Sequence, residues 1–414
     1  MLLMLAALSL RSLAIVLLYA LSSLLIWQFV GYPLLMGIIA LRQKPKDKDY
    51  SYQPFVSILV PTFDEEASIE KRIYNLYSLD YPTQNYEIIV VDSGSTDGTA
   101  HKVRELINNS KGESRPLLSL VREERRHGKG AAINVGKRHA RGDIILVTDA
   151  NAAFNEDALK EIAPLFKNPL VGAVGGRYAV LNPGTALTYA TKFYRELENV
   201  LRTGEAALCS ACLFDGELNA WRKDLMDIDP TMIAEDLDMC IKLRKMGYKI
   251  EYEPKAVVYE AVPTTFREQI TQRKRTSTGT ITSILNNLNY IVVPKGIYRL
   301  LILPSHKSLA MLSPFMLLAI PVLYVATQDW GIMLLHLTAT LIVFGVVFAL
   351  LARVRSLMGE TSRPERFSIR ALFRITWYVL LNEYIVASAW KDVVSGNYSV
   401  LWEMAKTTRR GGIL

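Results

Sequence analysis

The stretch Tyr86-Glu87-Ile88-Ile89-Val90-Val91-Asp92 decides the fold class of this chain. Its second half is apolar and β-branched, and it ends on an aspartate, as a buried strand often does. Val56–Val60 before it and Asp143–Thr148 after it have the same character, and segments with helical spacing separate them. This βαβ rhythm predicts a largely parallel sheet, whose ligands bind at the carboxyl ends of the strands. Two of these ends carry an aspartate, Asp92 and Asp149.

The composition indicates a membrane-associated protein in a reducing compartment. Of the 414 residues, 50% are hydrophobic and 21% are charged, and the mean hydropathy is positive at +0.17. These averages exclude disordered and collagen-like chains, and three cysteines are too few for a disulfide framework. The net charge of +8 suits either nucleic acid or an anionic membrane surface. Because the basic residues gather beside apolar blocks, we expect membrane lipids and no nucleic acid as partners.

Three apolar blocks predict helices in or on a membrane. Ser12–Leu41 has no charged residue and is long enough for one span, whereas a cleaved signal peptide would have a shorter apolar core. Ala310–Ala352 has Asp329 as its one charge and predicts two spans joined by a tight turn. Ala371–Trp390 contains Glu383, which is costly inside a membrane, and this favours an interfacial or re-entrant helix over a full span.

The flanking basic residues predict the topology. Arg42–Lys48, the loop at 353–370 and the C-terminal tail are rich in Lys and Arg, which remain on the cytoplasmic side. We therefore expect a multi-pass protein of the cell membrane with a cytoplasmic central domain. The expected domains are an N-terminal transmembrane helix and basic linker (1–54), a cytosolic α/β domain (55–263), amphipathic interfacial helices (264–309), two transmembrane helices (310–352), and a cytoplasmic loop with an interfacial or re-entrant helix and a basic tail (353–414).

The sequence lacks the glycine-rich loops with which common nucleotide folds hold phosphate. It contains no Walker loop, and residues 61–66 after the first strand contain no glycine. A carboxylate at a strand end can still hold a phosphate through a divalent cation, or accept a hydrogen bond from a base or ribose.

A series of motifs resembles glycosyltransferase family 2. The motifs, in chain order, are Pro61–Glu66, Val90–Thr99, Gly128–Gly136, Thr148–Asn151, Gly216–Arg222, Ala234–Asp236 and Gln272–Thr276. In addition, Trp402–Arg409 is similar to the cytoplasmic tail of membrane synthases of poly-N-acetylglucosamine, hyaluronan and cellulose. The resemblance implies a GT-A fold, flanked here by transmembrane and interfacial helices. It also implies an inverting hexosyltransferase that moves a sugar from a nucleotide diphosphate, usually UDP, to a lipid or growing polysaccharide at the membrane.

The resemblance also implies a donor site at the strand ends. The residues expected to bind the donor are Pro61, Thr62, Phe63, Glu65, Asp92, Lys129, Asp149, Gln272 and Arg275. Of these, Asp92 and the Pro61–Phe63 loop would hold the base, and Lys129 would offer its charge to the diphosphate. The alternatives are a strand-ending turn at Asp92 and a solvated basic loop at Lys129.

A metal site is implied where the family has an Asp-x-Asp pair. Here the positions are Asp149 and Asn151, which would hold Mg²⁺ or Mn²⁺ against the diphosphate. An amide oxygen can coordinate a hard cation but brings no negative charge, so we expect weaker binding than for two aspartates.

The acids at the start of a later helix are the expected catalytic centre. By the resemblance, Asp236 is the general base that deprotonates the acceptor. Gly216, Glu217, Arg222 and Glu235 are the expected acceptor-side residues. The simpler alternatives are acids that favour a helix N-terminus and, for the segment before Arg222, an ordinary packed strand.

Other features leave the product open. Thr276 stands where polymer synthases of the family have a tryptophan, so the sequence does not decide between processive and single transfer. For Cys209 and Cys212 we expect packing or a place in an acceptor-side loop, rather than zinc binding. A homo-oligomer or an accessory membrane subunit would help to form a channel. The alternative function is a non-catalytic lipid-binding or assembly subunit that retains the fold.

Overall fold

The chain divides into two compact units. The computed structural model describes residues 2–109, 114–182, 184–293, 295–327, 330–331, 333–335, 338, 369–401 and 407–410. One unit comprises Met1–Leu35 and Leu303–Lys391, and the other comprises Met36–Ile302 and Asp392–Leu414. Most of the second span expected within Ala310–Ala352, and most of the loop at 353–370, lie outside the described residues.

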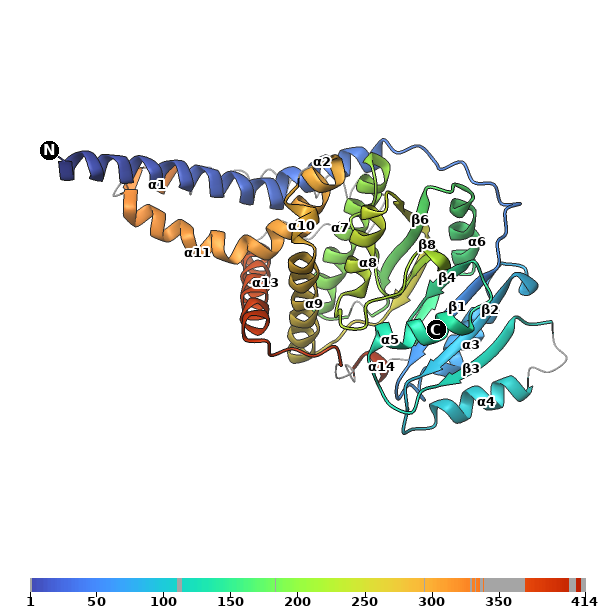
Figure 1. Ribbon diagram of the computed structural model, residues 1–414. Coiled ribbons are helices and arrows are strands. Elements are labelled where there is room, and N and C mark those ends of the chain that lie inside the picture. The colour runs from blue at the N-terminus through green and yellow to red at the C-terminus, as the bar shows by residue number, and fades with distance from the viewer. Residues whose placement is uncertain are drawn as a thin grey trace. The chain divides into compact units, whose positions relative to one another are not determined.

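The larger unit is built on a mixed sheet of eight strands within the described part of the chain (Figure 1). The strand order is β3-β2-β1-β4-β7-β6-β8-β5. The strands are β1 (Val56–Thr62), β2 (Tyr86–Asp92), β3 (Leu117–Arg122), β4 (Ile144–Val147), β5 (Ala152–Phe154), β6 (Val171–Val180), β7 (Asn219–Arg222) and β8 (Lys249–Glu260). The first four are mutually parallel, and β6 and β8 run in the same direction, whereas β7 and β5 are antiparallel to their neighbours. The expected largely parallel sheet is therefore confirmed for one half and is mixed in the other.

Helices cover both faces of the sheet. Buried apolar side chains of α3 (Ile69–Tyr77), α4 (Thr99–Asn109) and α6 (Ala158–Ile162) form the core with one face. On the other face α5 (Lys129–His139) lies against β1 and β2. There Gly136 allows close approach, because a Cβ at this position would come within 2.8 Å of a methyl carbon of Val91.

Further helices follow in the second half of the domain. They are α7 (Ala186–Leu208), α8 (Glu235–Lys245), α9 (Phe266–Asn286) and the short α10 (Leu288–Ile291). The helix α9 matches the helix expected in this region, and it packs on α8. Its buried side chains belong mainly to its second half, residues 278–283.

The basic linker before the sheet is tied to the domain. Lys46 pairs with Glu251 at 2.6 Å, and Lys48 pairs with both Glu161 and Glu253. The side chain of Lys48 is buried. These lysines, which the sequence predicted as a membrane-flanking run, therefore have carboxylate partners in the folded domain.

The smaller unit is helical and apolar. It contains α1 (Leu2–Ile26), a π-helical segment (Trp27–Gly31), part of α2 (Tyr32–Leu41), α11 (Leu309–Thr327) and most of α13 (Ile369–Ser395). By length and composition, two of the described helical stretches could cross a membrane, Leu10–Leu41 and Tyr298–Thr327. Within this unit, Ser313 of α11 donates a 2.7 Å hydrogen bond to Glu383 of α13. Glu383, whose charge is costly in a membrane span, thus has a polar partner.

Candidate functional site

Three carboxylates meet at one edge of the sheet because of strand register. Asp149 follows β4, whose last residue, Val147, pairs with Asn219 at the start of the antiparallel strand β7. Glu217 lies two residues before that start and so lies at the same edge. Glu260 is the last residue of β8, which runs in the same direction as β4.

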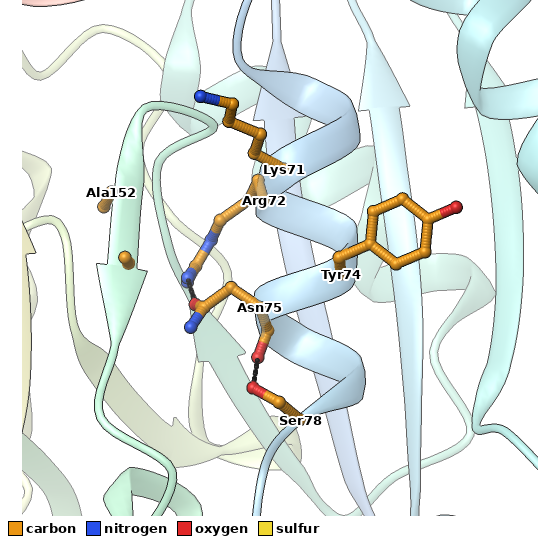
Figure 2. Close-up of a pocket in the computed structure, with 7 residues that line it drawn as sticks. Lys71, Arg72, Tyr74, Asn75, Ser78 and Ala152 are labelled. Atoms are coloured by element: carbon orange, nitrogen blue, oxygen red, sulfur yellow. Dashed lines mark hydrogen bonds between the residues drawn. The ribbon is translucent and has the colours of Figure 1, made fainter. Parts of the chain in front are cut away.

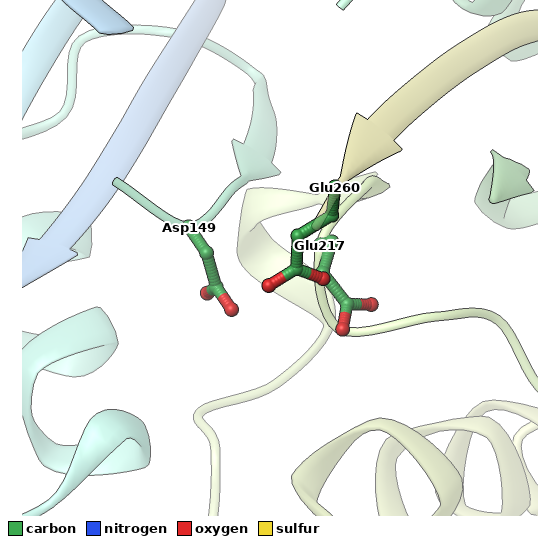
Figure 3. A group of neighbouring side chains, drawn as sticks. All are labelled: Asp149, Glu217 and Glu260. Carbon is green, nitrogen blue, oxygen red and sulfur yellow. The ribbon is translucent and has the colours of Figure 1, made fainter. Parts of the chain in front are cut away.

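The three side chains offer oxygen atoms that all lie within 4.8 Å of one another (Figure 3). Burial and the neighbouring charges of Glu260 and Asp215 hold the pKa of Glu217 well above its ordinary value. Burial and the charge of Asp149 likewise raise the pKa of Glu260. Oxygen ligands that repel one another in this way fit a hard divalent cation, which would relieve the repulsion.

Asn151 lies beside this cluster in a supporting position. It is buried, and its amide nitrogen donates a 2.8 Å hydrogen bond to Oε1 of Glu260. The other oxygen of Glu260 accepts a 2.8 Å hydrogen bond from the hydroxyl of Tyr178. The sequence prediction paired Asn151 with Asp149 at the metal. The structure adds Glu217 and Glu260 to Asp149 and connects Asn151 to Glu260.

Lys129 brings an ammonium group into the same cluster. Its Nζ lies 2.7 Å from Oδ1 of Asp149, 3.1 Å from the carbonyl oxygen of Gly216 and 3.8 Å from Oε1 of Glu235. Burial alone would lower the pKa of Lys129, but the charges of Asp149 and Glu235 raise it overall. The lysine is therefore held charged and joins the strand-end acids to the start of α8.

The start of α8 places Glu235 and Asp236 at this cluster. Burial and the neighbouring charge of Glu235 raise the pKa of Asp236 to about 6. The helix α9 fixes this position, because Ser283 donates to the carbonyl of Ala234 at 3.3 Å. A Cβ on Gly279 would lie 2.8 Å from the backbone nitrogen of Ala234, so the two helices are in close contact.

Arg275 of α9 is directed toward the same acids. Burial lowers its pKa, while the charges of Glu235, Asp149 and Asp236 act in the opposite direction. Gln272, one turn earlier, is exposed. The structure thus brings Lys129, Asp149, Gly216, Glu217, Glu235, Asp236 and Arg275 together from the set predicted by sequence.

The residues predicted for the nucleotide base lie at the ends of β1 and β2. Thr62 pairs with Asp92 across the two strands. The side chain of Asp92 is fully buried, accepts a 3.0 Å hydrogen bond from the backbone of Ser95 and pairs with Arg122 at 3.1 Å. Asp92 thus takes part in the strand-ending turn that the sequence left open as an alternative, and its binding of the base stays a prediction.

Next to these strand ends, an arginine covers an aromatic ring. The guanidinium of Arg126 lies 4.3 Å from the ring centre of Phe63, which follows β1 directly. Burial and the positive charge of Arg275 lower the pKa of Arg126. Sequence reasoning did not select Arg126, although it stands three residues before Lys129.

Two predicted residues have other partners in the structure. Glu65 is buried and accepts a 2.7 Å hydrogen bond from Ser68 at the start of α3. Arg222 donates to the backbone carbonyls of Phe166, Asn168 and Val171. It pairs with Ile144 at the far end of β4, so it lies at the opposite edge of the sheet from Asp149.

A pocket of about 330 Å³ lies between α3 and β5, with Arg72 in its buried wall (Figure 2). The guanidinium of Arg72 lies 4.0 Å from the ring centre of Phe154 and donates to Thr148 and Asn75. Burial lowers the pKa of Arg72 to about 9. Because Thr148 directly precedes Asp149, this buried arginine supports the strand end that carries the site.

Two of the three cysteines are packed in the interior. Cys212 and Cys240 are fully buried, and all three cysteines of the chain are free thiols. Cys209 lies 3.8 Å from the guanidinium of Arg244. The prediction of packing is thus confirmed for Cys212.

Comparisons with known proteins agree with this arrangement. Glycosyl transferase family 2 matches residues 57–215, and glycosyl transferase family group 2 matches residues 144–386. The chain is 28% identical over 230 residues to the poly-beta-1,6-N-acetyl-D-glucosamine synthase of Staphylococcus epidermidis, with 54% of each chain covered. It is 30% identical over 246 residues to the synthase of the same name from Staphylococcus aureus strain COL, with 58% of each covered. The chain thus spans about half the length of the curated relatives it matches.

A solved structure covers more of the chain. The mannosyltransferase PcManGT from Pyrobaculum calidifontis, solved in complex with GDP-Man and Mn²⁺, is similar to 92% of this chain, and the match covers 100% of that chain. The TM-score is 0.65 and the sequence identity is 28%. Since the second family match extends over more than half of the sequence, this chain belongs to glycosyl transferase family group 2.

Proposed function

We propose that this protein is an inverting glycosyltransferase that acts at a membrane. The observation that carries the proposal is the convergence of Lys129, Asp149, Glu217 and Glu260 with Asp236 at one sheet edge. The resemblance to family 2 supplies the reaction class, which is sugar transfer from a nucleotide diphosphate. The neighbour solved with GDP-Man and the relatives named as N-acetylglucosamine synthases leave both GDP- and UDP-sugars as donors to test.

The donor side would be formed by the strand ends. Asp149, Glu217 and Glu260 would hold Mg²⁺ or Mn²⁺, which would neutralise charge on the departing diphosphate. Lys129 and Arg275 would add positive charge to the same group. In this proposal Glu217 is a cation ligand, rather than the acceptor-side residue that the motif suggested.

The acceptor side would be formed by the start of α8. Asp236 would take the proton of the acceptor hydroxyl as that oxygen attacks the anomeric carbon. Its pKa of about 6 keeps it mostly deprotonated at neutral pH, and yet basic enough to accept a proton. Glu235, held near Lys129, would orient the acceptor.

The membrane side follows from the apolar helices. Leu10–Leu41 and Tyr298–Thr327 would anchor a multi-pass protein of the cell membrane, with the catalytic domain in the cytoplasm. A lipid or a growing polysaccharide at the membrane would be the acceptor. Access of a labelling reagent to a cysteine introduced at Arg410, from the side opposite the catalytic domain, would contradict this topology.

The test is release of nucleoside diphosphate by the purified full chain from a panel of UDP- and GDP-sugars, with Mn²⁺ and membrane lipids. Asp236→Asn should reduce turnover by about 10²–10⁴-fold. Its donor affinity should remain near that of the wild type, because the substitution acts on the chemical step. Glu235→Gln is the neighbouring comparison and should lose less. Wild-type turnover by Asp236→Asn would remove the assignment of the base, and full activity in excess chelator would remove the cation.

A further inference from the structure

Lys129 already occupies part of the site proposed for the divalent cation. Its ammonium contacts Oδ1 of Asp149 at 2.7 Å and the carbonyl oxygen of Gly216 at 3.1 Å, and it lies near Glu235. The side chain of Lys129 is 11% exposed, so these contacts replace most of its hydration. An internal cation thus lies where strong negative charge gathers.

The backbone before Lys129 gives this side chain a defined origin. Lys129 is the first residue of α5, and the preceding Gly128 has a φ of 101°, a conformation that side-chain-bearing residues rarely adopt. From this turn the side chain reaches across to Gly216, which precedes β7 in the sheet. Lysine has a long flexible chain, so its ammonium can change partners while the turn stays in place.

A divalent cation and the ammonium would compete for the negative charge of the Asp149 carboxylate. Mg²⁺ binds carboxylate oxygen at about 2.0–2.1 Å. A second cation near the same carboxylate would be repelled by the bound Mg²⁺. Cation binding at Asp149 would therefore favour movement of Lys129 away from it. A diphosphate beside the metal would give the released ammonium a new anionic partner.

We propose that Lys129 is a built-in counter-ion that neutralises Asp149 in the ligand-free protein and is exchanged for the divalent cation when the donor binds. The inference rests on the proposed function, because it takes the donor diphosphate as the second partner of Lys129. It explains why the cation and the donor would bind together. The cation alone must displace an ammonium that loses its partners, whereas with the donor present the ammonium is paired again.

The substitution Lys129→Met distinguishes the two proposed roles of Lys129, because it should have opposite effects on two affinities. Without the ammonium, Mn²⁺ alone should bind at least about tenfold more tightly. UDP or GDP in the presence of Mn²⁺ should bind at least about tenfold more weakly, since the diphosphate loses a positive partner. Lys129→Arg keeps the charge and should leave the affinity for Mn²⁺ alone close to that of the wild type.

The experiment is an electron paramagnetic resonance titration of free Mn²⁺ with the purified full chain, with and without UDP or GDP. Lys137→Met is the matched control, because Lys137 lies on the same helix and pairs with the exposed Asp227. Thermal unfolding of each variant checks that it is folded. Unchanged or weaker binding of Mn²⁺ alone to Lys129→Met would overturn the proposal, as would a wild type that binds no Mn²⁺ under either condition.

These titrations require no sugar transfer, so they are independent of the activity test. A wild type without transferase activity would contradict the proposed function. If Lys129→Met still bound Mn²⁺ alone more tightly in that case, the exchange at Asp149 would be supported by itself. Tighter Mn²⁺ binding together with unchanged nucleotide affinity would overturn the second half of the proposal, the transfer of Lys129 to the diphosphate.

Discussion

Replacing Glu217 by glutamine should stabilise the ligand-free protein and at the same time weaken its binding of a divalent cation. The reason is the position of Glu217 beside Asp149 and Glu260, where the three side chains offer oxygens within 4.8 Å of one another. Glutamine has nearly the same shape and removes only the charge. Most core substitutions destabilise a protein, so a stabilising result would be diagnostic.

The size of the effect follows from the separation of the charges. Two unit charges 4.8 Å apart repel by about 3.5 kcal/mol at an effective dielectric constant of about 20. Lys129 and Arg275 offset part of this repulsion, and the raised pKa of Glu217 means that part of it is already avoided by protonation. We therefore expect a net gain of about 1–3 kcal/mol in the free energy of unfolding, or about 2–5 °C in Tm for a unit of this size.

The assay is thermal unfolding in detergent at one scan rate and about pH 8, without metal and with Mn²⁺. Wild type should gain more stability from Mn²⁺ than Glu217→Gln, since a ligand that binds only the folded state raises Tm more when it binds more tightly. Glu105→Gln removes an exposed carboxylate of α4 and is the control. A lower Tm for metal-free Glu217→Gln, combined with an undiminished Mn²⁺ shift, would refute the placement of Glu217 at the cation.

Three further predictions concern the base, the support of α8 and the strand end. The value of kcat/KM should rise with pH through about 6 and then level off, because Asp236 accepts a proton only when ionised; a flat profile between about pH 5 and 8 would contradict this. Gly279→Val should reduce kcat more than donor affinity, because its side chain would displace Ala234; equal loss of both in steady-state kinetics would argue against selective positioning. Arg222→Met should lower the free energy of unfolding by about 1–3 kcal/mol, measured by denaturant titration, and leave donor affinity unchanged; a weaker donor complex would return Arg222 to the site.

Part of the site could be predicted because acids at the carboxyl ends of buried strands can be recognised from local sequence alone. Asp92 and Asp149 follow apolar β-branched runs, and both lie at the carboxyl edge of the sheet. The same signal is present at Glu260, which ends Val257-Val258-Tyr259-Glu260 three residues before Pro263. Sequence reasoning missed Glu260 because the strands that pair with β8 could not be deduced. Without them, it was unknown at which edge of the sheet Glu260 lies.

The partners of the Asp92 carboxylate could not be predicted, for a different reason. Its position was predicted, but local sequence does not reveal whether a carboxylate faces a ligand or its own turn. In the structure Ser95 and Arg122 use the carboxylate, and Arg122 comes from the neighbouring strand β3. The pairing therefore depends on a cross-strand register that only the assembled sheet provides.

The apolar blocks were the easiest feature to predict, since their signal is the continuous absence of charge. The helical stretch Leu10–Leu41 contains the whole of the predicted Ser12–Leu41 block. The basic linker that follows was harder, because positive charges beside a span have two kinds of partner. Lys46 and Lys48 bind carboxylates of the α/β domain, and those carboxylates lie more than 100 residues away in the sequence.

The segment Gly216–Arg222 shows why a motif that is continuous in sequence need not act as one site. The strand β7 begins at Asn219 and runs antiparallel to β4, so the two ends of the segment reach opposite edges of the sheet. Glu217 precedes the strand and lies with Asp149, whereas Arg222 ends it and holds backbone carbonyls at the other edge. Arg222 satisfies backbone carbonyl groups, which contributes to stability. Glu217 lies beside two other acids, an arrangement that suits the binding of a cation. Substitutions at the two ends should therefore change the free energy of unfolding in opposite directions, and only those at Glu217 should weaken cation binding, although both residues belong to one motif.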